Sequence, residues 1–208
     1  MKQITLSLYS FEELSEEAKQ KAIEDHRDLC NGDQPAWADE NRESMEKFSE
    51  IFPIKVTNWS YGGRGEGVDF RFETEDYIEE LSGVRLATYI WNNYKNKLFK
   101  GKWYSKAWDE KLRILNPSKG TGVERRSKII LDNCCVLTGY CMDDTILDPI
   151  YQFLNKPSNI DFRELLEDCF DAWIKACNSD IEWQNSYEYL SEELINNEYE
   201  FEEDGSKF

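Results

Sequence analysis

The chain has 208 residues, with 25 Lys and Arg against 42 Asp and Glu, which gives a formal net charge of −17. This charge repels phosphate and argues against direct nucleic-acid binding, and the sequence has no apolar run of about 18 residues that would span a membrane. The first residues lack the apolar region of a signal peptide, so we expect a cytoplasmic location, a reducing compartment and free thiols for the six cysteines.

The charge is unevenly distributed along the chain. Residues 1–84 carry a net charge of −11, residues 85–128 carry +9, and residues 129–208 carry −15. One interpretation is solubility together with charge matching between parts of the fold, and the other is a binding surface of one sign. We expect the basic segment 85–128 to be mainly an internal electrostatic partner of the acidic parts, and a second binding face is the alternative.

Two amphipathic helices are predicted after an N-terminal strand. Residues 1–10 alternate apolar and polar side chains, which favours a strand. Residues 10–30 open with Ser and Glu residues that can cap a helix, and apolar side chains then recur every three or four residues. His26 falls near this apolar face without a Ser, Cys or Asp pattern around it, so we interpret it as a hydrogen-bonded residue at the core boundary. A second helix is predicted over residues 37–52.

A glycine-rich β-hairpin is predicted over residues 54–72, at the centre of the fold. Its first strand places Trp59 and Tyr61 on the same face as Lys55, and its return strand gathers apolar side chains on one face: Val68, Phe70 and Phe72. The glycines lead into a strand and not into a helix, so we expect a flexible turn instead of a phosphate-binding loop. The alternative is a tip that contacts a partner through Trp59, Tyr61 and Arg64.

The basic middle of the chain predicts two more helices. A short acidic turn over residues 74–81 precedes helical spacing over residues 85–99 and 104–115. The aromatic side chains there fall on the helical period, so we interpret them as core and not as a platform for stacking bases. The loop 116–122 is the predicted boundary between an α+β part, residues 1–115, and an acidic helical part, residues 116–208, within one compact unit.

The acidic C-terminal part predicts helices followed by a last strand. Apolar spacing favours a helix through residues 130–141, and Asp148-Pro149 is typical of another helix N-terminus. Residues 161–177 form the clearest amphipathic stripe, with a capping box at its start and two cysteines on its buried face. A final helix over residues 182–195 leads into an acidic strand near residues 198–202, which we expect to pair with the first strand or with the hairpin.

No cofactor, metal site or catalytic set is predicted. The cysteines do not have the spaced pairs of a zinc site, and the chain has one His. Asp143 and Asp144, with Asp132 and Asp148 nearby, form the single acidic cluster in a segment of irregular pattern. Acid–base or metal chemistry would require these oxygens to converge in a pocket, and chance clusters are expected among 42 acids.

Three stretches together carry a family resemblance: YSFEELSEEAKQKAI, VLTGYCMDDTILDPIYQFL and NEYEFEEDG. They resemble a widespread family of acidic phage and prophage proteins, mostly uncharacterised, some of which are labelled antitoxin-like. The resemblance covers both ends and the region near residue 150, and it includes no catalytic signature to transfer. It implies a bacterial cytoplasm during phage infection or lysogeny.

The predicted fold class is α+β, with a small antiparallel sheet of about three to five strands and a central hairpin, covered by roughly six to eight helices. The leading hypothesis is a phage-encoded, non-catalytic protein that inhibits a host defence or nucleic-acid-processing protein, as an acidic mimic of nucleic acid in the manner of anti-CRISPR proteins. Its candidate partner-binding residues are Glu192, Glu193, Glu198, Glu200, Glu202, Glu203 and Asp204.

Two alternatives stay open. The first is an antitoxin-like protein that neutralises a partner toxin with a basic surface. The second is a small-ligand-binding protein or an enzyme that uses His26 or the Asp143–Asp144 segment. The sequence leaves the oligomeric state open.

Overall fold

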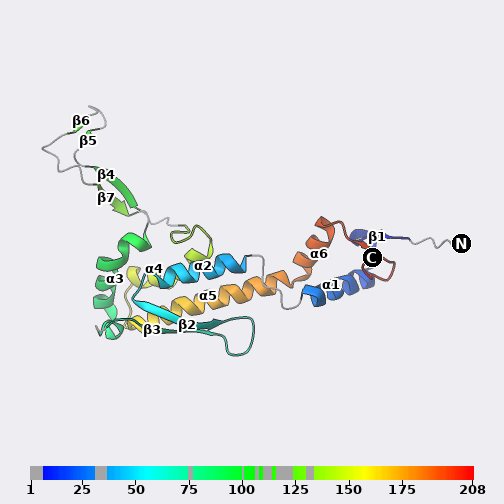
Figure 1. Cartoon of the computed structure of the whole chain (residues 1–208), viewed down its shortest axis with the longest axis horizontal. Coiled ribbons are helices and arrows are strands. Elements are labelled where there is room, and N and C mark those ends of the chain that lie inside the picture. The colour runs from blue at the N-terminus through cyan, green and yellow to red at the C-terminus, as the bar shows by residue number, and fades with distance from the viewer. Residues whose placement is uncertain are drawn as a thin grey trace. The chain divides into compact units, whose positions relative to one another are not determined.

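The computed structural model (Figure 1) describes residues 7–74, except 31–36, then 77–99 and 134–208, and between the last two ranges only four short strands. Side chains of residues 28–30 and 101–133 are outside the described part. Within the described residues, six α-helices and four pairs of antiparallel strands form an α+β fold, which confirms the predicted class. The strands are separate pairs instead of one sheet of three to five strands.

The chain divides into two compact units. One consists of Met1–Ala38 and Cys177–Phe208, and the other of Asp39–Ala176. The predicted boundary at residues 116–122 falls within the second unit and outside the described residues, so that boundary stays a prediction. Among the described residues, no helix combines the length and the apolar character needed to cross a bilayer.

The first unit joins the two ends of the chain. β1 (Tyr9–Ser10) pairs antiparallel with β8 (Glu200–Phe201), which confirms the predicted pairing of the first and last strands. The short 3₁₀ helix η1 (Phe11–Glu13), α1 (Glu16–Cys30) and α6 (Tyr187–Asn196) complete the unit. Leu14, Ala18 and Ala22 of the predicted stripe belong to the core, which comprises Phe11, Leu14, Ala18, Ala22, Ile23, Leu190, Leu194 and Phe201.

The second unit is built on the long helix α5 (Phe162–Gln184), whose last turns belong to the first unit. The other elements are α2 (Ala38–Ser49), β2 (Ile54–Ser60), β3 (Gly67–Phe72), η2 (Ile78–Glu80), α3 (Gly83–Leu98) and α4 (Met142–Asn155). The predicted stripe on α5 is buried throughout: Phe162, Leu165, Leu166, Cys169, Phe170, Trp173, Ile174 and Cys177. Burial raises the pKa of the Cys169 thiol, which keeps it protonated and unreactive.

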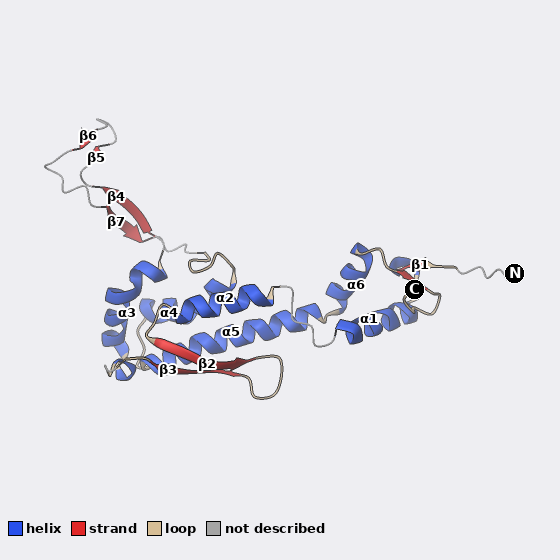
Figure 2. Ribbon diagram, viewed as in Figure 1, coloured by secondary structure: helices blue, strands red, loops and turns tan. Residues whose placement is uncertain are grey.

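The β2–β3 hairpin lies along α5 in Figure 2. The rings of Phe70 and Phe170 lie 5.2 Å apart, and those of Phe72 and Phe162 lie 5.5 Å apart. The apolar face predicted for the return strand is therefore the face that packs on the helix. Aromatic pairs at such distances add about 0.5–1.5 kcal/mol each beyond the burial of their area.

A β-bulge corrects the predicted face of Trp59 and Tyr61. The register of β2 shifts between Val56 and Asn58, so no residue of β3 lies opposite Thr57 in the strand pairing. An extra residue in one strand reverses the alternation beyond it. Trp59 and Tyr61 consequently pack on the helix side of the hairpin, with ring centroids 5.7 and 5.4 Å from that of Trp173.

The helix predicted over residues 104–115 is wrong. Three short strands occupy this region: β4 (Gly101–Ser105), β5 (Trp108–Asp109) and β6 (Ile114–Leu115). β4 pairs antiparallel with β7 (Glu124–Ile129), and β5 pairs with β6. Short segments rich in aromatic residues fit both the helical spacing and the alternation of a strand. Pairing with another strand then determines which structure forms.

The start predicted for the next helix is also wrong. Residues 134–141 form turns instead of continuing a helix, and α4 begins at Met142 and not at Asp148. Pro149 lies inside α4, where it removes one backbone hydrogen bond. The helix remains continuous because buried apolar side chains anchor it on both sides of the proline: Ile146, Leu147, Ile150 and Phe153.

Candidate functional site

The seven predicted partner-binding residues all belong to the first unit. We call them the C-terminal acidic surface: Glu192, Glu193, Glu198, Glu200, Glu202, Glu203 and Asp204. They come from the end of α6, the connection to β8, and the turn after β8. Six of them are exposed, and Glu193 is half-buried. The structure therefore brings these residues together on one small unit.

The C-terminus of α6 positions the middle of this surface. The helix ends in a Schellman motif, in which the N–H of Glu198 donates to the carbonyl of Ile195 at 3.0 Å and the N–H of Tyr199 donates to the carbonyl of Leu194 at 3.2 Å. Glu198 occupies the left-handed position of the motif at a φ of 52°. Glycine is the usual residue there, because a side chain in this conformation costs about 1–2 kcal/mol.

Few of these carboxylates are balanced by a cation. Asp204 Oδ2 accepts a hydrogen bond from Lys21 Nζ at 2.6 Å, and this bond, followed by those from Ser206, lowers the pKa of Asp204 to about 2. Glu193 Oε1 lies 3.5 Å from Nε2 of the buried His26. The remaining five form no salt bridge with any described residue: Glu192, Glu198, Glu200, Glu202 and Glu203.

A pocket of about 410 Å³ adjoins the C-terminal acidic surface. The buried side chains of Phe11 and Leu194 supply apolar lining, and four exposed carboxylates line it as well: Glu12, Glu13, Glu198 and Glu200. Its volume lies within the range of about 300–1,000 Å³ found for ligand sites. A long apolar stem with a cationic head, as in Lys or Arg, suits this combination of linings.

Glu12 and Glu13 are members of this site that the sequence did not predict. Glu12 follows β1, whereas Glu200 lies in β8, almost the whole length of the chain away. The pairing of β1 with β8 brings the two into one pocket. The predicted pairing of the first and last strands was the signal that could have identified Glu12.

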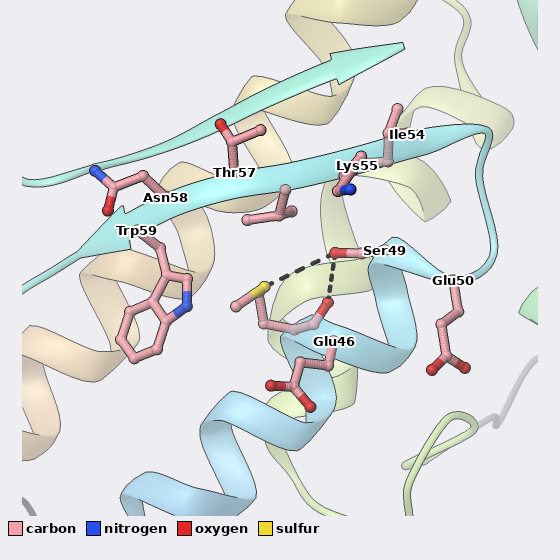
Figure 3. A pocket seen from close by; sticks show the side chains of 10 residues that line it. Glu46, Ser49, Glu50, Ile54, Lys55, Thr57, Asn58 and Trp59 are labelled. Atoms are coloured by element: carbon pink, nitrogen blue, oxygen red, sulfur yellow. Dashed lines mark hydrogen bonds between the residues drawn. The ribbon is translucent and has the colours of Figure 1, made fainter. Parts of the chain in front are cut away.

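A second pocket lies between α2 and β2 in the other unit (Figure 3). Its volume is about 480 Å³, and Met45, Val56 and Trp59 line it together with polar residues. The two acids on its α2 side have cationic neighbours: Glu46 lies 3.8 Å from Arg42, and Glu50 lies 2.9 Å from Lys47. Charge is thus balanced locally here, in contrast to the C-terminal acidic surface.

Of the residues predicted for the hairpin tip, Trp59 stays exposed and Tyr61 is half-buried, so their contact with a partner stays a prediction. Trp59 and Tyr61 stack on each other with ring centroids 5.8 Å apart, and both rings meet Trp173 edge-on. The buried Trp173 in turn donates its indole N–H to the carbonyl of Asn41 at 2.8 Å. Arg64 is exposed in the turn. The aromatic pair therefore holds the hairpin on α5.

Asp143 has a structural role. Its buried carboxylate accepts backbone N–H groups from residues 137, 138 and 139 at 2.8, 2.7 and 3.2 Å, and the Thr138 hydroxyl at 2.8 Å. These bonds hold the preceding loop on the first turn of α4. Neither Asp143 nor His26 lines either pocket described above.

One group of potential metal ligands occurs among the described residues. The Sγ atoms of Cys134 and Cys135 and a carboxylate oxygen of Asp144 all lie within 4.8 Å of one another. Cysteine spacing alone could not identify this group, because Asp144 joins it through the loop that Asp143 holds. The basic segment 85–128 lies largely outside the described side chains, so its predicted role stays a prediction.

Comparisons of the chain with protein-family models, curated proteins and solved structures found no match. The resemblance to phage and prophage proteins therefore stays a prediction.

Proposed function

We propose that this chain is a phage-encoded, non-catalytic binding protein. Its C-terminal acidic surface docks on the basic surface of a host defence or nucleic-acid-processing protein and occupies the place of nucleic acid. The observation that carries the proposal is the set of five exposed carboxylates without a salt bridge to a described residue, next to a partly apolar pocket.

Electrostatics supports a partner of opposite sign. Like charges held on a small folded unit repel one another, and a basic partner relieves this repulsion when it binds. Such complementarity accelerates association and makes it sensitive to salt. Glu46 on α2 and Glu50 just after it, by contrast, already have partners within the chain, so they offer less to an incoming cation.

A non-catalytic role is consistent with the side chains that could have served an enzyme. The carboxylate of Asp143 is occupied by four hydrogen bonds from the loop before α4. His26 belongs to α1 and is buried beside Glu193 and Tyr199. Both side chains thus contribute to the structure of their own unit.

The experiment is affinity capture from bacterial host lysate with the immobilised chain, at salt concentrations of about 50 and 200 mM. A triple variant, Glu198→Lys, Glu200→Lys and Glu202→Lys, is compared with a control of equal charge change made at three exposed acids of the same unit: Glu17→Lys, Glu24→Lys and Glu188→Lys. The captured protein is then purified, and its affinity for each variant and for its nucleic acid is measured.

We expect one basic host protein, recovered in near-equal amount, whose capture weakens with salt and is lost in the triple variant but kept in the control. The wild-type chain should also displace nucleic acid from that protein. Capture that survives the triple variant, or a partner that still binds nucleic acid in the complex, contradicts the proposal. Recovery of a small toxin encoded beside this chain supports the antitoxin-like alternative instead.

A further inference from the structure

Two adjacent thiols and a carboxylate meet where the loop before α4 returns to the first turn of that helix. Cys134 Sγ lies 3.1 Å from Cys135 Sγ, and a carboxylate oxygen of Asp144 completes a set whose members all lie within 4.8 Å of one another. Cys134 is exposed, and Cys135 and Asp144 are half-buried. An ion from solvent can therefore reach the group.

The fold holds these ligands in place. Asp144 Oδ1 accepts the backbone N–H of Cys135 at 2.9 Å, which leaves its second oxygen without a hydrogen bond to any described residue. Asp143, its neighbour, anchors the same loop through the N–H groups of residues 137–139. Cys135 adopts a left-handed backbone, at a φ of 54°, where the chain turns. Supports of this kind, which fix the direction of a ligand, are typical of metal sites.

We propose that Cys134, Cys135 and Asp144 form a binding site for a thiophilic divalent cation of the Zn²⁺ class. Two thiolates and one carboxylate match the ligand types that such ions take, and three protein ligands leave a fourth tetrahedral position open.

A bound cation offsets the negative charge that two thiolates and one carboxylate gather within 4.8 Å, and it favours the thiolates that ligate it.

A disulfide between the same two sulfurs would compete with metal binding. Adjacent residues have Cα atoms about 3.8 Å apart, which is shorter than the 4.4–6.8 Å usual for disulfides. Such a bond would be strained and easily reduced in a compartment rich in thiols. The geometry therefore favours the ion over the disulfide.

The test uses the reduced full-length chain, freed of metal by chelation, and Cd²⁺ and Zn²⁺ as probes. Cd²⁺ binding is followed by the ultraviolet charge-transfer absorbance of the metal–thiolate bond, and Zn²⁺ binding by calorimetry. We expect one ion per chain. Cys134→Ser, Cys135→Ser and Asp144→Asn should each weaken binding by at least about tenfold, since even outer supports of a ligand are worth about 10–100-fold.

Asp148→Asn serves as the control, because it removes an exposed carboxylate from the same helix. The circular dichroism of every variant must match that of the wild type, so that lost binding reports a lost ligand. Binding that persists in Cys135→Ser, binding no weaker in Asp144→Asn than in Asp148→Asn, or absence of the charge-transfer band overturns the proposal. So does a Cys134–Cys135 disulfide that resists millimolar thiol.

Discussion

Replacing Gly205 by Ala tests whether the C-terminal turn packs on α1 as the structure describes. Gly205 has a φ of 86°, in the left-handed region. A Cβ built on it would lie 2.2 Å from the carbonyl oxygen of Ala18 and 2.9 Å from the carbonyl carbon. Both are backbone atoms in the first turn of α1, so they cannot rotate away as a side chain would. The turn must therefore move or α1 must distort.

Two costs add in this variant. The left-handed conformation costs about 1–2 kcal/mol for a residue with a side chain, and overpacking costs about 1–3 kcal/mol. We expect Gly205→Ala to lower the free energy of unfolding by about 2–5 kcal/mol. This is a large share of the roughly 5–15 kcal/mol that stabilises an ordinary domain. Urea unfolding followed by far-ultraviolet circular dichroism measures the loss, and hydrogen exchange in α1 localises it.

Gly63→Ala is the matched control in the hairpin turn. Its added Cβ meets no heavy atom within 4 Å, and its φ lies outside the left-handed range. The control should change the free energy of unfolding by less than about 0.5 kcal/mol. If Gly205→Ala were as stable as Gly63→Ala, the close approach of the last turn to α1 would be refuted.

Two further substitutions probe the acidic surface and the loop before α4. Glu198→Gly should raise the free energy of unfolding, measured in urea, by about 1 kcal/mol, because glycine suits the left-handed position at the end of α6. The same substitution should weaken partner binding, because it removes a carboxylate of the acidic surface. A loss of stability would contradict the strain assigned to Glu198. Asp143→Asn should lower that free energy by about 3 kcal/mol, because an amide nitrogen cannot accept the hydrogen bonds that the buried carboxylate receives. A change no larger than that of Asp148→Asn would show that these bonds contribute little.

Local patterns predicted the helices that carry the core. In α5, apolar side chains at helical spacing and a capping box agree, and the structure has both halves of the box, from Asp161 N to Glu164 Oε2 at 3.0 Å and from Glu164 N to Asp161 Oδ1 at 2.9 Å. The hairpin was likewise predictable, because alternation and glycines point to the same structure. Where several local signals indicate the same secondary structure, contacts between distant residues seldom change it.

Contacts between distant residues decided the remainder. The bulge at Thr57 places Trp59 on the opposite side of the hairpin from the predicted one, and no local sequence pattern predicts the bulge. The start of α4 depends on Asp143, whose carboxylate accepts hydrogen bonds from the preceding loop. The apolar spacing of that loop alone predicts a helix. The acidic residues of the candidate site were predictable as a cluster, whereas Glu12 and the group around Cys134 required the fold.

The acidic surface differs from a flexible acidic tail in the way that its carboxylates are held. Phe201, buried to 1 % exposure between Glu200 and Glu202, anchors β8 in the core of the first unit. The close approach of Gly205 to α1 and the Schellman motif at Glu198 fix the backbone on either side. A disordered tail of equal charge would lose conformational entropy when it bound, whereas these carboxylates are ordered before a partner arrives. Binding energy from a basic partner is therefore available for affinity, and the fold of the first unit determines which arrangements of cations it can recognise.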